Sequence, residues 1–167
     1  QIFVPYKEVL DIYEKGLKVP EDITIVWPDD NYGYIKKLSN ADERKREGGS
    51  GVYYHISYLG WPNDYLWLNT TSPALMYAEM QKAWSLGADR YWLLNAGDIK
   101  PGELGVQLFL DMAWDFDSFT FENVNEHNAD FLASIFGKDY EEEFAYILDR
   151  YYHLAFERKP EYMTWEW

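Results

Sequence analysis

The first hundred residues alternate short apolar runs with longer segments of helical periodicity. The runs are rich in β-branched and aromatic residues and predict four strands, at residues 2–4, 23–27, 52–58 and 91–94. Between the first two, apolar residues recur at helical spacing from Tyr6 to Leu17, and Pro20 predicts the end of that helix. Strands and helices that alternate in this way are typical of a parallel sheet with right-handed crossovers. The predicted fold class is therefore α/β.

Two further helices are predicted on either side of the fourth strand. Ser72 can cap the first of them with Pro73 at its first position, and Gly87 predicts its end. The second helix, over 104–113, carries apolar residues on more than one face, so we expect it to be largely buried. The connection between the second and third strands is less regular, and there we expect a short helix over 34–38 followed by an exposed loop.

The pattern changes near residue 117, after which no strand signal appears. An apolar helical stripe ends at Gly137, and Asp139 with Glu142 resembles a capping box that opens a second helix. The inner side of this last helix is predicted to carry Phe144, Ile147, Leu148, Tyr151, Leu154 and Ala155. The chain therefore divides into an α/β part, residues 1–117, and a helical part, residues 118–167.

Composition narrows the choice of partners. The chain carries 29 acidic and 15 basic side chains, a formal charge of −14, which excludes a nucleic-acid partner because phosphates need a basic surface. The same acidity does not favour attraction of an acidic polymer. Hydrophobic residues make up 47% of the chain without a run of membrane-spanning length, so we expect a soluble chain with a sizeable core and no membrane partner. The absence of cysteine excludes disulfides, thiolate zinc sites and thiol nucleophiles.

Polar side chains follow every predicted strand at its carboxyl end. The clusters are Tyr6-Lys7-Glu8, Asp29-Asp30-Asn31-Tyr32, His55 with Tyr58 and Trp61, and Asn95-Ala96-Gly97-Asp98. Singly, each has an ordinary explanation as a turn, a helix cap or a hydrogen-bonded core residue. In parallel α/β folds, however, the chemistry gathers at this end of the strands. The repeated pattern therefore predicts a functional site.

Three kinds of protein could use such a set of residues. A glycosidase would use two carboxylates as acid and base. A metal-dependent hydrolase would bind a hard metal ion through Asp29, His55 and Asp98. A non-catalytic carbohydrate-binding module would rely on its aromatic side chains, which make up 19% of the residues. Because no motif fixes a metal geometry, we predict neither a metal nor a cofactor.

Five motifs of the chain resemble the catalytic-domain signature of glycoside hydrolase family 115. They are Tyr6-Lys7-Glu8-Val9, the stretch from Trp27 to Gly33, the stretch from Gly49 to His55, Asp64-Tyr65-Leu66-Trp67, and the stretch from Asn95 to Pro101. The resemblance covers nearly the whole chain. It implies an α-glucuronidase that removes glucuronic acid or its 4-O-methyl ether from xylan side chains with inversion, on a (β/α)8 barrel followed by a helical domain.

The resemblance also implies roles for individual residues. Glu8 matches the family's proposed catalytic acid, and Lys7, Asp29, Asn31 and Tyr58 match its sugar-contacting residues. Inverting hydrolysis needs a second carboxylate about 6.5 to 9.5 Å from the acid. Asp29, Asp30 or a residue outside this chain could supply it. The predicted catalytic residues are Glu8 and Asp29, and the predicted substrate-binding residues are Lys7, Asp30, Asn31, Tyr32, His55, Tyr58 and Trp61.

Enzymes of this family are several times longer than this chain, and a full barrel needs about 250 residues. We therefore expect the chain to be the C-terminal half of a barrel with the start of the helical domain. Open sheet edges predict pairing with the upstream half or with a second copy, and inactivity of the chain alone. The N-terminus has neither an initiator methionine nor a signal peptide, so we expect it to be internal to a longer protein. The resemblance implies a periplasmic or secreted location.

Overall fold

The computed structural model describes residues 1–61, 66 and 68–160, and the chain forms two compact units. The first unit comprises Gln1–His55 and Glu79–Asn95, and the second comprises Ile56–Ala78 and Ala96–Trp167. The predicted division into a barrel part and a helical part at residue 117 stays a prediction.

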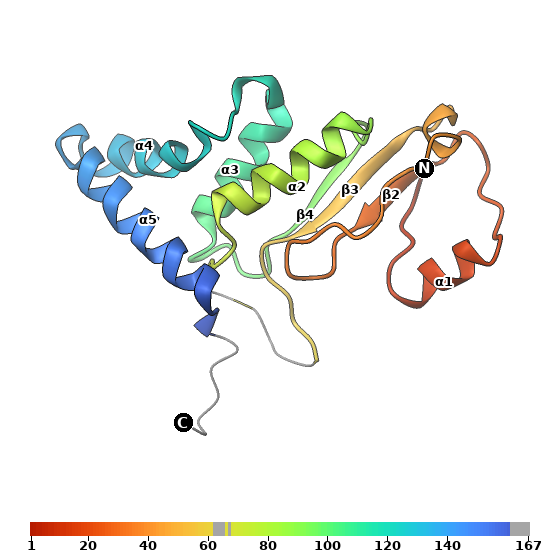
Figure 1. The fold of residues 1–167 in the computed structure, drawn as a ribbon, viewed down its shortest axis with the longest axis horizontal. Coiled ribbons are helices and arrows are strands. Elements are labelled where there is room, and N and C mark those ends of the chain that lie inside the picture. Colours follow the sequence, from red (N-terminus) through yellow and green to blue (C-terminus); the bar gives the residue numbers. More distant parts are fainter. Residues whose placement is uncertain (62–65, 67, 161–167) are drawn as a thin grey trace. The chain divides into compact units, whose positions relative to one another are not determined.

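The first unit is built on a four-stranded parallel sheet (Figure 1). Its strands are β1 (Ile2–Phe3), β2 (Thr24–Pro28), β3 (Ser50–His55) and β4 (Trp92–Asn95). They pair in chain order, and every pair is parallel. The α/β class and the four predicted strands are thereby confirmed, although β3 ends at His55 and not at Tyr58. Because all four strands run the same way, their carboxyl ends lie along one edge of the sheet.

The sheet is strongly buried in its centre, as expected of parallel strands covered on both faces. In β2, Ile25, Val26 and Trp27 are completely buried, and in β3 the same is true of Val52 and Tyr54. The polar edges of the buried aromatic rings are satisfied, since the Trp27 indole donates to Ser39 Oγ over 2.8 Å and the Tyr54 hydroxyl donates to the Gly33 carbonyl over 3.0 Å. The predicted strands thus form the core of this unit.

The helices that flank the sheet follow the predicted pattern in outline. Helix α1 (Glu8–Glu14) follows β1, and helix α2 (Pro73–Ser85) precedes β4. The predicted cap of α2 is confirmed, because Leu75 N donates to Ser72 Oγ over 3.2 Å. Its predicted end is also confirmed, because Gly87 has φ +77°, a conformation that glycine adopts readily.

The short helix predicted over 34–38 is wrong. This stretch forms an isolated antiparallel bridge between Asp29 and Ile35, and a short 3-10 helix, η1 (Glu43–Lys45), lies in the predicted loop. The physical reason lies in the backbone N–H groups. Tyr34 N donates to Asp30 Oδ1 over 3.2 Å and Ile35 N donates to Glu79 Oε2 over 2.7 Å, so carboxylates take the places of helical carbonyl acceptors.

The second unit is helical beyond its first segment. Its elements are α3 (Glu103–Trp114), the 3-10 helix η2 (Phe116–Ser118), α4 (Val124–Phe136), the 3-10 helix η3 (Lys138–Tyr140) and α5 (Glu141–Glu157). In α3, Leu108, Phe109 and Met112 are buried, but Leu110 is exposed, so the helix has one covered face. Helices α4 and α5 pack against each other (Figure 1), and α4 ends before Gly137 as predicted.

Of two expectations for the last helix, the capping box is wrong, and the inner face is confirmed at Ala155 but displaced elsewhere. The predicted capping box does not form, because Asp139 lies within η3 and α5 begins at Glu141 without a side-chain cap. The predicted inner face is also displaced. Tyr152 and Ala155 are the buried residues of α5, whereas Ile147 and Leu154 are 57% and 47% exposed. A 3-10 turn before the helix delays its start, and the burial of Tyr152 fixes a different face inward.

Tyrosines of α5 hold the segment that leads into α2. The Tyr152 hydroxyl accepts a hydrogen bond of 3.2 Å from Asn69 Nδ2, and the Tyr151 hydroxyl donates to the Leu68 carbonyl. Asn69 is buried and has φ +46°, and a Cβ on Gly105 of α3 would lie 2.8 Å from its Oδ1. The helices of the second unit therefore fix the backbone at Leu68 and Asn69.

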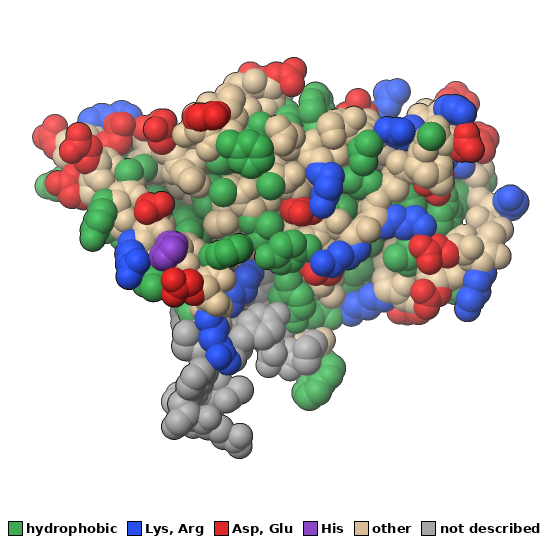
Figure 2. Space-filling model, in the orientation of Figure 1, with side chains coloured by type: hydrophobic (Ala, Val, Ile, Leu, Met, Phe, Trp, Pro, Cys, Tyr) green, Lys and Arg blue, Asp and Glu red, His purple; other side chains and the backbone are tan. Residues whose placement is uncertain are grey.

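Acidic residues are concentrated in the second unit. It carries 17 acidic and 5 basic side chains, whereas the first unit carries 12 and 10, so the net charges are −12 and −2. Figure 2 shows acidic side chains gathered where α4 joins α5, a stretch that includes Asp139, Glu141, Glu142 and Glu143. Among the described helices, none combines the length and the apolar character needed to cross a membrane.

The stability of the first unit should fall at high pH through Tyr13. Burial and a hydrogen bond of 2.7 Å donated to Glu43 raise the pKa of Tyr13 from 10.0 to about 12. The unfolded chain therefore loses the tyrosine proton first, and the folded form loses stability as pH rises from 10 to 12. In thermal unfolding of the protein containing this chain, we expect the wild type to lose stability relative to Tyr13→Phe over this range. Parallel pH dependence of the two proteins would contradict the prediction.

Candidate active site

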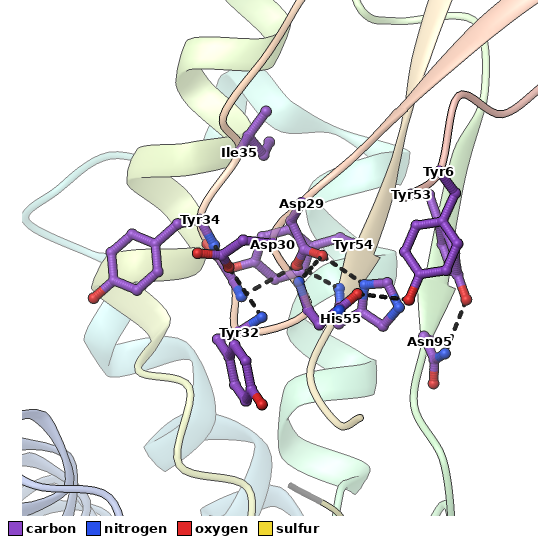
Figure 3. Close-up of polar contacts among 12 residues, drawn as sticks. Tyr6, Asp29, Asp30, Tyr32, Tyr34, Ile35, Tyr53, Tyr54, His55 and Asn95 are labelled. Carbon is purple, nitrogen blue, oxygen red and sulfur yellow. Dashed lines mark hydrogen bonds and ion pairs between the residues drawn. The ribbon is translucent and has the colours of Figure 1, made fainter. Parts of the chain in front are cut away.

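All four strands contribute polar or aromatic side chains to the edge where their carboxyl ends meet. Tyr6, which follows β1, donates its hydroxyl proton to Asn31 Oδ1 over 2.7 Å. Asp29, which follows β2, contacts His55 at the end of β3, and Asn95 of β4 donates to the Tyr53 hydroxyl over 2.9 Å (Figure 3). Each contact joins neighbouring strand ends. The structure therefore brings these polar side chains of the first unit together, while their role as a site stays a prediction.

The carboxylate of Asp29 is the centre of this arrangement. Its side chain is completely buried and accepts hydrogen bonds at both oxygens. Oδ1 accepts from Asn31 N over 2.9 Å and contacts His55 Nδ1 at 2.5 Å, while Oδ2 accepts from Gly33 N over 3.1 Å and from His55 N over 2.9 Å. A buried carboxylate is tolerated only when it is satisfied in this way. Asp29 thus joins the turn after β2 to the end of β3.

The imidazole of His55 is buried between tyrosine rings. It lies 4.4 Å from the Tyr53 ring and is stacked on the Tyr6 ring at 6.0 Å, with an interplanar angle of 20°. Since the carboxylate of Asp29 is an acceptor, we assign a proton to Nδ1, which donates to it. The Asp29 contact therefore fixes the orientation of the ring.

A pocket of about 230 Å³ opens beside these residues. It is lined by Tyr6, Lys7, Leu10, Pro28, Asp29, Asp30, Asn31, Lys36 and Lys37. Lys36 lies 3.3 Å from Asp30 Oδ2, and Lys37 lies 2.7 Å from Glu14 Oε1, so both cations have carboxylate partners. The Lys7 ammonium lies 5.1 Å from the centre of the Tyr6 ring. Cationic and amide groups in a small hollow are suited to a polar ligand that carries a carboxylate.

Two residues of this pocket have unusual backbone conformations. Lys7 has φ +52° and Asn31 has φ +75°, values that side-chain-bearing residues adopt rarely. Asn tolerates this region better than Lys does. Each residue follows the carboxyl end of a strand, β1 in one case and β2 in the other. Such strained residues concentrate at binding and catalytic sites, where the surrounding structure holds them in place.

The remaining predicted site residues lie in different parts of the chain, two in the first unit and two in the second. Glu8 is the exposed first residue of α1, directly after Lys7 of the pocket. Tyr32 lies in the turn after β2, with its backbone N–H donating to Asp30 Oδ1 over 3.0 Å and its ring pointing away from the Asp29 carboxylate (Figure 3). Tyr58 and Trp61 belong to the second unit, where Tyr58 is buried and Trp61 is 89% exposed. Their convergence with Glu8 stays a prediction.

The geometry gives no support to a metal site. Among residues 1–61, 66 and 68–160, no group of three His, Asp or Glu side chains is placed to hold a metal ion. Asp29 and His55 lie together, but the Asp29 carboxylate and His55 Nδ1 are hydrogen-bonded to each other. Asp98, the third predicted ligand, belongs to the second unit. Of the family-like motif Asp64-Tyr65-Leu66-Trp67, Asp64, Tyr65 and Trp67 lie outside the described residues.

Sequence reasoning missed the tyrosines that surround His55. Tyr6 belongs to a predicted polar cluster but is not among the predicted site residues, and Tyr53 is predicted only as part of a strand. A signal was present for Tyr53, because residues two apart on a strand point to the same face, which puts Tyr53 beside His55. No local signal marks Tyr6, since its partner Asn31 lies 25 residues away.

Two comparisons with known proteins match the chain over most of its length. The model of glycosyl hydrolase family 115 matches residues 1–162. A solved structure described as a family GH115 4-O-methyl-α-glucuronidase, BtGH115A, with specificity for decorated arabinogalactans, superposes with a TM-score of 0.92 at 50% sequence identity. The match covers 97% of this chain and 21% of that one, so the chain spans about a fifth of its structural relative. Among the curated proteins, none matches the chain.

The backbone of Asn31 can be tested separately from its amide. Asn31→Gly and Asn31→Val both remove the acceptor of Tyr6, but only glycine adopts φ +75° without strain. We expect the valine variant to be less stable than the glycine variant by about 1–2 kcal/mol, the cost of a left-handed conformation. Thermal unfolding of the two variants measures the difference. Equal stability would show that the turn relaxes and that no strain is held there.

Proposed function

We propose, because the chain belongs to glycosyl hydrolase family 115, that it forms part of an α-glucuronidase. The proposed reaction removes α-1,2-linked glucuronic acid, or its 4-O-methyl ether, from glucuronoxylan. The observation that carries the proposal is the pocket at the strand ends. Lys7 and Asn31, which match sugar-contacting positions of the family, line it together, and Glu8 directly follows Lys7.

The proposed mechanism is hydrolysis with inversion. Glu8 protonates the glycosidic oxygen as it leaves, while a second carboxylate removes a proton from the water that attacks the opposite face of the sugar. Glu8 is exposed and sits at the start of α1, so a substrate can reach it. Its neighbour Lys7 supplies a positive charge for the carboxylate of the uronic acid, and Asn31 supplies an amide for that carboxylate or a hydroxyl.

The second carboxylate, which acts as the base, belongs either to this chain or to another part of the longer protein. Asp29 has no solvent-exposed side-chain surface, whereas the Asp30 side chain is 28% exposed and lines the pocket. Asp30 already accepts from two backbone N–H groups through Oδ1 and faces Lys36 through Oδ2. Asp30 is therefore the better placed of the two, and a residue outside this chain is the alternative.

The partners of the two sheet edges are proposed from the size of the structural relative, of which this chain covers 21%. β1 and β4 each pair with one strand among the residues that the structure describes, which leaves two sheet edges for pairing. We propose that further strands of the same longer protein complete a (β/α)8 barrel there, and a second copy of the chain is the alternative. The family resemblance favours a periplasmic or secreted location. The proposed acid–base hydrolysis uses no cofactor.

Replacement of Glu8 tests the assignment of the acid. In the full-length protein, Glu8→Gln keeps the shape of the side chain but cannot supply a proton, so we expect turnover of glucuronoxylan to fall by about 10²-fold to 10⁴-fold. Binding of glucuronic acid should change little. Asp11→Asn is the matched control, because it removes an exposed carboxylate one turn further along α1 and should leave turnover unchanged.

Two results would return Glu8 to a structural role at the helix terminus. One is near-normal turnover by Glu8→Gln, and the other is equal loss in both variants. A wild-type protein that binds the sugar without releasing uronic acid would instead favour the carbohydrate-binding module. Decorated arabinogalactan, offered beside glucuronoxylan, identifies the polymer that carries the uronic acid.

A further inference from the structure

We propose that Asp29 is a positioning residue, which holds Asn31 and His55 at the sheet edge and does not serve as the second catalytic carboxylate. The inference deepens the proposed function and rests on it for the meaning of the site. It is carried by hydrogen bonds, burial and ring contacts within the first unit. In these contacts Asp29 holds the backbone of Asn31, a residue that lines the pocket.

The contacts around Asp29 form a closed circuit. Asp29 Oδ1 accepts from Asn31 N, Asn31 Oδ1 accepts from the Tyr6 hydroxyl, the Tyr6 ring stacks on His55, and His55 Nδ1 returns to Asp29 (Figure 3). Each member therefore restrains the next. The circuit restrains the side chains of Tyr6 and His55 by two contacts each, while Asp29 holds the backbone of Asn31 and Tyr6 holds its amide.

Solvent access argues against a base at Asp29. A general base must reach the attacking water, directly or through one other water molecule. The Asp29 side chain is 0% exposed, and its two oxygens already receive three backbone N–H groups and the His55 ring. Activation of water at Asp29 would require these contacts to break. Holding the turn requires only that they persist.

Asn31 is the pocket residue that Asp29 holds in place. Its Oδ1 accepts the Tyr6 proton, which makes Nδ2 the donor end of the amide, and Asn31 is one of the residues that line the pocket. Its backbone has φ +75°, and the bond from Asn31 N to Asp29 holds that conformation. A donor fixed in this way suits an oxygen of the sugar or the carboxylate of a uronic acid.

Double-mutant kinetics in the full-length protein test the proposal. We expect Asp29→Asn and Asn31→Ala each to lower kcat/KM, by about 10²-fold for a misplaced contact, and the double variant to lose much less than the product of the two. Asp42→Asn is the control for loss of a carboxylate, because Asp42 is exposed and its carboxylate pairs only with Lys45 among the contacts described. Independent, multiplicative losses would overturn the proposal.

Azide provides a sharper discrimination. In a variant that lacks the base of an inverting glycosidase, azide can attack the anomeric carbon while the acid protonates the departing oxygen, so a glucuronosyl azide forms and turnover returns. We expect Asp29→Ala to show no rescue by azide. Formation of the glucuronosyl azide in this variant would make Asp29 the base and overturn the proposal.

Tyr6→Phe covers the case in which the Asp29 variants do not fold. It keeps the stacking on His55 and removes only the bond to Asn31, so we expect a fall in kcat/KM that is not additive with Asn31→Ala. Unchanged kcat/KM in Tyr6→Phe would overturn the proposal. If the wild type releases no uronic acid, the proposed function fails, but imidazole nitrogen NMR shifts still decide whether His55 carries its proton on Nδ1. A proton on Nε2 alone would overturn the positioning role.

Discussion

A carboxylate without access to water lies where β2 ends, and the geometry of the sheet edge follows from how it is satisfied. Burial of an ionisable group is costly unless every hydrogen-bonding position is used. Asp29 meets that requirement with two N–H groups of its own turn and with the backbone and ring of His55. The turn after β2 and the end of β3 are therefore fixed to the same two oxygens. Because Asn31 lies in that turn, the site depends on the same constraint.

Much of the fold could be predicted because its signals are local. Strands β1 to β4 are apolar runs that extend only a few residues, and α2 has a serine cap, a first-turn proline and a terminal glycine within its own sequence. The positions of the site could also be predicted in part, because parallel strands bring their carboxyl ends together whatever the turns contain. That rule alone joins Asp29, Asn31 and His55, which are up to 26 residues apart.

What could not be predicted depends on partners distant in sequence. Glu79 lies 44 residues from Ile35 and accepts its N–H group, so no pattern within 34–38 excludes a helix there. Tyr152 is turned inward in part by Asn69, 83 residues earlier, which displaces the apolar face read from α5 alone. The positioning role proposed for Asp29 could not be predicted for the same reason, because its partner His55 lies 26 residues away. A carboxylate after a strand looks the same in sequence whether it faces a pocket or a buried imidazole.

The distribution of charge bears on how an acidic chain could bind the acidic substrate that we propose for it. Most of the net charge of −14 belongs to the second unit, whereas the first unit, which carries the pocket, has a net charge of −2. At the pocket, Lys36 lies against Asp30 and Lys37 lies against Glu14, while the Asp29 carboxylate accepts its four contacts. Charges beyond about 8 Å are largely screened at physiological ionic strength, so the charges that line the pocket would act most strongly on the proposed uronate. Positive and negative groups at the pocket are therefore close to balance, so an anion that reaches Lys7 meets less repulsion there than the net charge of −14 suggests.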